Sequence, residues 1–389
     1  MITSLLFFVA NQVNVGQNNP APASSAPLKN AFIRVSTDNG KILVNQTPYF
    51  TTIDEQGNVF KTTKAFSIEY GWQMLGGKEW HQTCKYPHVG IGGQYLHVMK
   101  RKELGHPFSV YGFYDGNYFW SKNFQLTNRM ATGFTYGFTT YNPNDPLPND
   151  VISTKLNAFI ELGLGAAMRL SDFLVVEPGF RFAHFSNGNI RKPQRGINIA
   201  SFSIGLKSTL SRPPVAPINM PLSECLHRHE VLAYLGMAPR QIEFDAESPH
   251  KTYGMNFLMA NLHLGYNYEV SRRIKLGGGV DFIYDGTNGQ RETARAEMPN
   301  RGDVAFRDKT GLSVFIGGES SIGQLSVVAT LGYMAEQTRF EYSTPAFEQR
   351  LGFKYHFYRN VFAGANVRAY RFRAAKAVEF HIGARKFIS

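Results

Sequence analysis

The stretch KLNAFIELGLGAAMRL, residues 155–170, decides the fold because its side chains alternate in character from one residue to the next. All the even positions are apolar, whereas the odd positions include Lys155, Asn157, Glu161 and Arg169. A period of two is the repeat of a β-strand, whose successive side chains point to opposite faces. At about 3.3 Å per residue the stretch spans roughly 50 Å, which is longer than most strands of soluble proteins. It therefore predicts a strand that crosses a membrane at a tilt.

The same alternation recurs along the chain, for example in residues 258–268 and 325–333. The 389-residue chain contains 37 glycines, and 14% of its residues are aromatic, which suits a barrel with aromatic girdles at its rims. A mean hydropathy of −0.25 and the lack of any run of 18 apolar residues argue against transmembrane helices. The sequence therefore predicts an all-β fold, a transmembrane antiparallel β-barrel of the outer-membrane type.

About sixteen strands are expected, and the proline-rich segment RPPVAPINMP, residues 212–221, divides them eight and eight. We favour one large barrel, with two consecutive eight-stranded barrels as the alternative. Short connections alternate with long ones, and outer-membrane barrels have short periplasmic turns and longer extracellular loops. The expected strands lie near residues 41–52, 64–75, 87–99, 107–117, 122–140, 154–170, 173–187, 197–210, 227–240, 255–270, 273–285, 309–320, 324–336, 346–357, 360–371 and 375–388.

Four segments are expected from this reading. Residues 1–30 form a signal peptide and a flexible leader, because Ile2 to Ala10 is an apolar run of the right length for a signal-peptide core. Residues 31–210 carry the first strands, 211–226 form a proline-rich periplasmic connection, and 227–389 carry further barrel strands. The predicted location is the bacterial outer membrane.

The formal net charge of +12 favours an anionic partner. The basic residues are scattered over strands and loops, so a phosphate-rich membrane surface is a better partner than nucleic acid, although the charge could also belong to a solvated surface without a partner. Cys84 and Cys225 would both lie on the periplasmic side, where they could pair or remain thiols. Cys225 could also bind a metal with His227 and His229, but three such residues in five occur often by chance.

One strand-like hairpin places polar residues among apolar ones: FLVVEPGFRFAHFSNGNIRKPQRGINIASFSIGLK, residues 173–207. On the period of two, His184 and Ser186 fall on the same side as Phe180 and Phe182, which is the side expected to face lipid. Asn198, on the next strand, is expected opposite them. Polar groups on a lipid-facing side are costly unless they lie near the interface, where a lipid substrate could reach them.

These residue types suit nucleophilic catalysis. A serine becomes a nucleophile when a neighbouring base removes its proton, and histidine is the usual base. The base needs a partner that orients its other ring nitrogen, which Asn198 could provide. An amide such as that of Asn187 could stabilise an oxyanion. Without further support, an H-x-S pair at the end of a strand is more often an interfacial polar pair with no chemistry.

The run AHFSNGNIRKPQRGIN resembles the active-site hairpin of the lipid A 3-O-deacylase (PagL-like) family of outer-membrane barrels, whose Bacteroidota relatives are commonly called acyloxyacyl hydrolases. The strong resemblance covers residues 173–210, and a looser one covers about 60–210, including AFSIEYGWQ, YPHVGIGG and KELGHPFSVYGFYDG. It implies that Ser186 is the nucleophile, His184 its base and Asn187 an oxyanion donor. The implied activity is hydrolysis of an ester-linked acyl chain of lipid A without metal or cofactor.

The sequence departs from the family in two ways. The best-understood members have a glutamate that orients the histidine, where this chain has Asn198, and their barrels have about eight strands. We therefore keep two alternatives to an outer-membrane serine esterase acting on lipopolysaccharide or phospholipid. One is a non-catalytic structural or lipid-binding subunit, with a protein partner bound through the second half. The other is a porin-like channel lined by Lys155, Glu161, Arg169, Glu177 and Arg181.

The loops beside these residues are basic. Arg191, Lys192 and Arg195 lie in the hairpin loop, and arginine and lysine are suited to phosphate oxygens. We expect them to contact lipid phosphates, with ordinary solvated loop charges as the alternative. Arginines also recur in the longest loop, at Arg291, Arg295, Arg301 and Arg307.

Overall fold

The computed structural model describes residues 30–43, 62–98, 104–121, 123–142, 144–145, 149–210, 217–243, 252–289, 304–337, 346–370 and 374–388. The expected signal peptide and nearly all of the expected leader lie outside the described residues, as do Arg291, Arg295 and Arg301.

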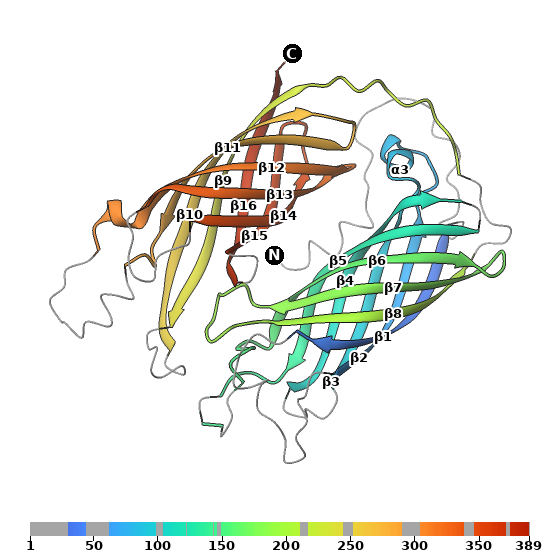
Figure 1. Ribbon diagram of the computed structural model, residues 1–389, viewed down its shortest axis with the longest axis horizontal. Coiled ribbons are helices and arrows are strands. Elements are labelled where there is room, and N and C mark those ends of the chain that lie inside the picture. Colours follow the sequence, from blue (N-terminus) through green and yellow to red (C-terminus); the bar gives the residue numbers. More distant parts are fainter. Residues whose placement is uncertain are drawn as a thin grey trace. The chain divides into compact units, whose positions relative to one another are not determined.

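Eight antiparallel strands close the first barrel (Figure 1). They are β1 (Ala31–Ile42), β2 (Thr62–Gln73), β3 (His88–Val98), β4 (Gly105–Trp120), β5 (Phe124–Phe138), β6 (Leu156–Arg169), β7 (Leu174–Ser186) and β8 (Ile197–Thr209). Each strand pairs with the next in sequence, and β8 pairs with β1 to complete the ring. A short helix, α3 (Glu79–Thr83), lies in the connection between β2 and β3.

Eight further antiparallel strands close the second barrel. They are β9 (His229–Glu243), β10 (Thr252–Glu269), β11 (Ile274–Asp285), β12 (Thr310–Ile322), β13 (Leu325–Gln337), β14 (Phe347–His356), β15 (Val361–Tyr370) and β16 (Ala374–Ile388). Here β16 pairs with β9 to complete the ring. A single 3-10 turn, η2 (Phe306–Lys309), precedes β12.

The all-β class is confirmed, and the sixteen strands of the described residues agree with the expected total of about sixteen. Their arrangement is the two-barrel alternative. A single sixteen-stranded barrel is wrong because β8 bonds to β1, so the first eight strands leave no edge for a ninth. The first strand was expected at residues 41–52 but runs over Ala31–Ile42. Its alternation is weak near its end, where Thr37, Asn39 and Lys41 occupy the outward positions in place of apolar residues.

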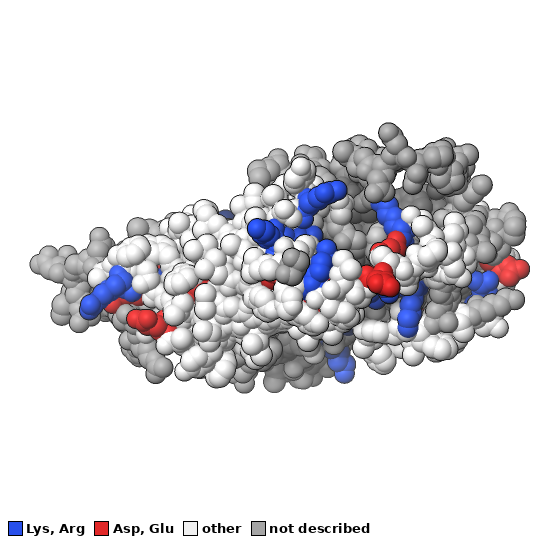
Figure 2. Space-filling view, turned by 90° about the horizontal axis from the view of Figure 1, so that it is seen from above, with Lys and Arg blue, Asp and Glu red and all other residues white. Residues whose placement is uncertain are grey.

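Large apolar side chains cover the outside of both barrels. Uncharged residues occupy broad areas of the face in Figure 2, with few charged side chains between them. Exposed apolar residues of the first barrel include Ile33, Val35, Phe66, Ile68, Ile91, Phe108, Val110, Leu126, Phe134, Leu162, Leu164, Phe180, Phe182, Phe202, Ile204 and Leu206. Such a surface is suited to lipid. Among the described residues, the helices are all too short or too polar to span a membrane.

Buried ion pairs fill the interior of the first barrel. Arg34 lies 2.7 Å from Asp115, and Arg129 lies 2.6 Å from Glu161. Glu69 contacts both arginines. All five side chains are more than nine-tenths buried. Because leaving a buried charge without its partner costs about 3–5 kcal/mol, loss of any one of these groups would destabilise the barrel. The described part of the interior thus contains a network of paired charges.

The second barrel has an ion-pair network of its own. Arg350 lies 2.6 Å from Asp281 and 3.1 Å from Glu348. Arg368 lies 2.6 Å from Glu348 and 2.8 Å from Glu379. These residues are also buried.

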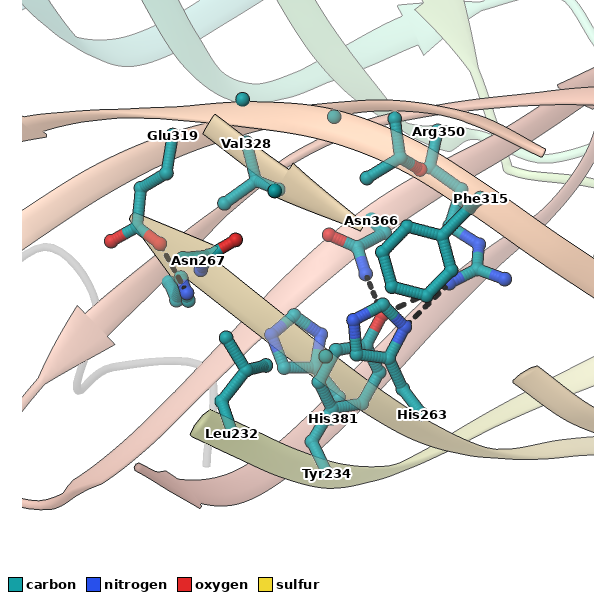
Figure 3. Close-up of a pocket in the computed structure, with 16 residues that line it drawn as sticks. Leu232, Tyr234, His263, Asn267, Phe315, Glu319, Val328, Arg350, Asn366 and His381 are labelled. Carbon is teal, nitrogen blue, oxygen red and sulfur yellow. Dashed lines mark hydrogen bonds and ion pairs between the residues drawn. The ribbon is translucent and has the colours of Figure 1, made fainter. Parts of the chain in front are cut away.

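A small cavity of about 40 Å³ lies inside the second barrel (Figure 3). The ring of His263 stacks between Tyr234 and Phe315, with centroids 4.1 and 4.3 Å apart. The Tyr234 hydroxyl accepts hydrogen bonds from Arg350 and Asn366. Since one water needs roughly 10–15 Å³ of such volume, the cavity has space for a few waters and none for an acyl chain.

The two cysteines do not form a disulfide, and Cys84 is buried whereas Cys225 is partly exposed. Within the described ranges, no group of three His, Cys, Asp or Glu side chains is arranged to hold a metal ion. Cys225, His227 and His229, which were weighed as metal ligands, are not among such groups.

Candidate active site

Three neighbouring strands bring the predicted catalytic residues together at one end of the first barrel. Ser186, the last residue of β7, pairs with Ala158 of β6, and His184 pairs with Asn198 of β8. His184 and Ser186 share the side of β7 on which Phe180 is 69% exposed. Because side chains two apart on a strand are neighbours, the histidine and the serine lie next to each other on the outward side of the sheet.

A short polar contact at this site joins His184 to Asn198. The distance between His184 Nδ1 and Asn198 Oδ1 is 2.6 Å. An amide oxygen only accepts hydrogen bonds, so Nδ1 carries the proton and Nε2 keeps its lone pair. This is the tautomer that a general base needs. The sequence-based expectation that Asn198 lies opposite His184 thus agrees with the strand register.

Gly196 lies against both the histidine and the serine. Its φ of +72° is in the left-handed region, which favours glycine. A Cβ atom built here would be 3.0 Å from His184 Cε1 and 3.5 Å from Ser186 Cβ. It would also be 2.9 Å from the carbonyl oxygen of Phe185. A side chain at position 196 would therefore displace the His184 ring. The absence of a side chain on Gly196 leaves the space that the ring occupies.

A buried loop segment, Asn149 to Ser153, supports Gly196 from the connection between β5 and β6. The Gly196 N–H donates to the carbonyl of Val151 at 3.0 Å. Asn149 holds this segment in shape, because its Oδ1 accepts from the N–H groups of Val151 and Ile152 and its Nδ2 donates to the Thr139 carbonyl. Val151 and Ile152 are fully buried. They belong to one apolar cluster with Phe138, Phe159, Phe185 and Ile197.

The remaining predicted residues lie in the hairpin loop that follows Ser186. Asn187 is 8% exposed, and its Nδ2 donates to the Arg191 carbonyl at 2.9 Å, so one amide hydrogen is engaged. Arg191 and Arg195 are exposed, and Lys192 is partly exposed.

Two features of the site were not found by sequence reasoning. Gly196 is the glycine near the end of the quoted run AHFSNGNIRKPQRGIN. A glycine at the end of a loop could have indicated a left-handed backbone conformation there. The segment from Asn149 to Ser153 lies in a long loop with no periodic pattern, so only the folded structure reveals its contact. Glu177, which was expected to face the lumen, does so and pairs with Lys207 at 2.6 Å.

Comparison with known families agrees with this geometry. The model described as "Lipid A 3-O-deacylase (PagL)" matches residues 64–207, and the one described as "Acyloxyacyl hydrolase, C-terminal domain" matches residues 229–388. The chain belongs to the PagL-like lipid A deacylase family. The first match lies within the first barrel and contains His184, Ser186 and Asn198. The second match covers the second barrel. This PagL-like protein is an outer-membrane protein.

No curated protein matches the chain. Among solved structures, Neisserial surface protein A (NspA) is 8% identical with a TM-score of 0.31, covering 46% of this chain and 97% of its own. The TodX deltaS2S3 mutant monoaromatic hydrocarbon channel is 10% identical with a TM-score of 0.18, covering 95% and 92%.

The H-x-S pattern occurs once in this PagL-like chain, at residues 184–186. The five histidines between residues 229 and 388 are each followed, two positions later, by a residue other than serine. The acyloxyacyl hydrolase C-terminal domain therefore does not repeat the His–Ser arrangement of the first barrel.

Replacing Gly196 with alanine is expected to lower acyl release from lipid A by roughly 10- to 100-fold, because small displacements of a catalytic group cost about that much. The new Cβ would displace the His184 ring while the barrel still forms. The measurement is the initial rate of fatty-acid release, together with thermal unfolding of the purified protein.

Gly323→Ala provides the matched control, because Gly323 also has a positive φ of 65° but lies in the turn between β12 and β13 of the second barrel. It should carry a similar backbone strain and keep full activity. Full activity of Gly196→Ala would contradict a positioning role for this glycine.

Proposed function

We propose that the first barrel is a serine esterase that hydrolyses an ester-linked acyl chain of lipid A, or of a related outer-leaflet lipid. The observation that carries the proposal is the 2.6 Å contact between His184 and Asn198 on the side of the hairpin that also presents Ser186. This arrangement supplies a nucleophile, a base and a group that orients the base, which is the logic of a serine hydrolase. Membership of the lipid A deacylase family supports the choice of substrate.

In the proposed mechanism, Ser186 Oγ attacks the acyl carbonyl carbon while its proton moves to Nε2 of His184. Asn198 holds the protonated imidazole through Nδ1–H. The tetrahedral intermediate then collapses: the bond between the acyl carbon and the sugar oxygen breaks, and that oxygen takes the proton from Nε2. Water attacks the resulting acyl-serine with His184 again as base. The free fatty acid leaves and Ser186 recovers its proton.

The negative charge on the tetrahedral oxygen needs hydrogen-bond donors, and we assign one of them to Asn187. Its side chain follows Ser186 directly in the chain, and an amide N–H is the kind of donor that stabilises an oxyanion. Removing one such donor typically costs about 10²- to 10³-fold in rate. Arg191, Lys192 and Arg195 would bind phosphates of the same lipid from the hairpin loop.

The orientation in the membrane follows from the connections. Ser186 lies at the end of the barrel that carries the connections between β1 and β2 and between β5 and β6. The opposite end carries the short connections between β4 and β5 and between β6 and β7, together with the longer one that contains α3. Outer-membrane barrels keep short turns in the periplasm. We therefore assign the Ser186 end to the outer leaflet, where lipid A resides.

The direct test is to incubate the purified protein with lipopolysaccharide and, separately, with phospholipid, and to measure the released fatty acid and the remaining lipid by mass spectrometry. We expect lipid A that has lost one ester-linked chain. Folded protein that releases nothing from either lipid would overturn the esterase.

A second candidate, a non-catalytic lipid-binding or structural subunit, is favoured by one observation. Asn198 cannot carry the negative charge that the family's carboxylate supplies to the histidine. The second barrel, which lacks the His–Ser pattern, would then bind a protein partner. Tight binding of lipid A without any release of fatty acid would favour this candidate.

A porin-like channel receives less support. Of the five residues expected to line it, Glu161, Glu177 and Arg181 form ion pairs in the lumen, whereas Lys155 is exposed and Arg169 lies at a strand end near Asp172. The charges of the described lumen compensate one another and would not select anions. We expect no steady single-channel conductance in planar bilayers, and stable ion-selective steps would contradict this expectation.

A further inference from the structure

Basic side chains form a stripe on the outward side of the first barrel, beside the candidate active site. We define the basic stripe as Lys41 of β1, Lys64 of β2, His97 of β3 and His106 of β4, all of which are exposed. Each lies within two residues of the end of its strand, at the same end of the barrel as Ser186. The stripe therefore occupies the level of the lipid headgroups in the orientation proposed above.

The strand register makes the stripe continuous. Lys64 pairs directly with His97 of β3 and, on its other side, with Asn39, two residues from Lys41 on β1. On β4, His106 is bound through its Nδ1 to the hydroxyl of Tyr95 at 2.8 Å. Paired strands lie about 4.8 Å apart, so neighbouring members of the stripe can contact one ligand.

Closure of the barrel brings this stripe to the active-site hairpin. Lys41 pairs with Ala200 of β8, and Ala200 is two residues from Asn198 on the same side of that strand. At about 4.8 Å between strands and about 3.4 Å per residue, the backbone of Lys41 is roughly 12 Å from that of His184. A lysine side chain extends about half of this distance, so one lipid headgroup can span the stripe and Ser186.

The stripe has no compensating charge on its own strands. The only carboxylates in β1, β2, β3, β4 and β8 are Asp38, Glu69 and Asp115, and all three are buried in the lumen. Glu69 forms ion pairs with Arg34 and Arg129. The lysines therefore face outward without an acidic partner on the strands that carry them, which suits an anionic ligand.

We propose that the basic stripe binds a phosphate of the lipid A headgroup and so determines which ester-linked chain reaches Ser186. This inference rests on the proposed function, because it takes the same lipid as the ligand. The phosphate supplies the negative charge that the strands lack, and it sits at headgroup depth. With the phosphate fixed over β1 and β2, the sugar extends across β8 towards β7, and the acyl chain lies along the apolar outward side formed by Phe180, Phe182 and Phe202.

The test measures binding in the Ser186→Ala background, so that no turnover occurs. Native mass spectrometry in detergent would compare bisphosphorylated lipid A with lipid A stripped of its phosphates. Lys41→Gln and Lys64→Gln are each expected to weaken binding of the phosphorylated lipid roughly fivefold, since an exposed ion pair contributes up to about 1 kcal/mol. Binding of the phosphate-free lipid should not change.

Lys386→Gln is the matched control, because Lys386 is an exposed lysine on β16 of the second barrel and its replacement removes the same charge. It should leave both affinities unchanged. Equal losses for the two lipids, or no loss with either lysine variant, would overturn the proposal. The proposal would also be overturned if the stripe bound inorganic phosphate while Lys41→Gln and Lys64→Gln left the affinity for lipid A unchanged.

The result is separable from the esterase itself. If wild-type protein releases no fatty acid but the lysine variants still lose affinity for phosphorylated lipid A, the esterase fails and the phosphate site stands. If wild-type protein releases fatty acid and the lysine variants bind as the parent does, the esterase stands and the phosphate site fails.

Discussion

Ser186→Ala is expected to reduce fatty-acid release from lipid A by at least about 10³-fold, to the background of the assay. Removal of the nucleophile of a serine hydrolase leaves only the catalysis that binding and oxyanion stabilisation provide, and losses reach about 10⁶-fold. The measurement is time-resolved mass spectrometry of lipid A and free fatty acid. The serine is 7% exposed and its replacement by alanine removes one oxygen atom, so the barrel should fold as before.

Ser208→Ala is the matched control, because Ser208 lies on the same side of its strand but near the other end of β8. This variant should release fatty acid at the wild-type rate. His184→Gln should match Ser186→Ala, since a serine and its base act as one unit and their losses do not add. If Ser186→Ala retained wild-type release, the nucleophile would have to be sought elsewhere in the chain.

Asn198→Asp is expected to increase the rate of acyl release, by at least tenfold. Asparagine and aspartate have the same shape, so Oδ1 should keep its 2.6 Å contact with His184 Nδ1. A carboxylate additionally stabilises the imidazolium that forms when His184 takes the proton. The reverse change in a serine protease triad costs about 10⁴-fold, which sets the upper limit of the gain.

The measurement is kcat/KM for lipid A, compared among the wild type, Asn198→Asp and the similarly sized apolar variant Asn198→Leu. The order of rates should be Asp, then Asn, then Leu. A slower Asn198→Asp enzyme would contradict the orienting role of this residue. Absence of release from all three proteins would favour the lipid-binding subunit.

The strands and the polar trio could be predicted from the sequence because both follow from a period of two. Once residues 173–187 and 197–210 are read as paired strands, His184, Ser186 and Asn198 fall on one side without any knowledge of loops. The weakly patterned strand Ala31–Ile42 was placed too late in the sequence because its outward end is polar. That same polar end contains Lys41 of the basic stripe.

Closure of the barrels and the support of Gly196 could not be predicted in the same way. Pairing of β8 with β1 rather than with β9 depends on which distant segments of the chain meet. The local alternation of side chains does not predict this pairing. The proline-rich segment at residues 212–221 marked the boundary without deciding between one ring and two. The contact of Val151 with Gly196 joins two loops, where side-chain periodicity gives no information.

The pairing of β1 with β8 also bears on how the polypeptide is assembled in its membrane. Every strand of the first barrel has both neighbours before any residue of β9 is needed. Closure of the first ring therefore requires no strand of the second, and closure of the second requires no strand of the first. If the chain were cut between the two barrels, each fragment would still contain all eight strands that its barrel needs.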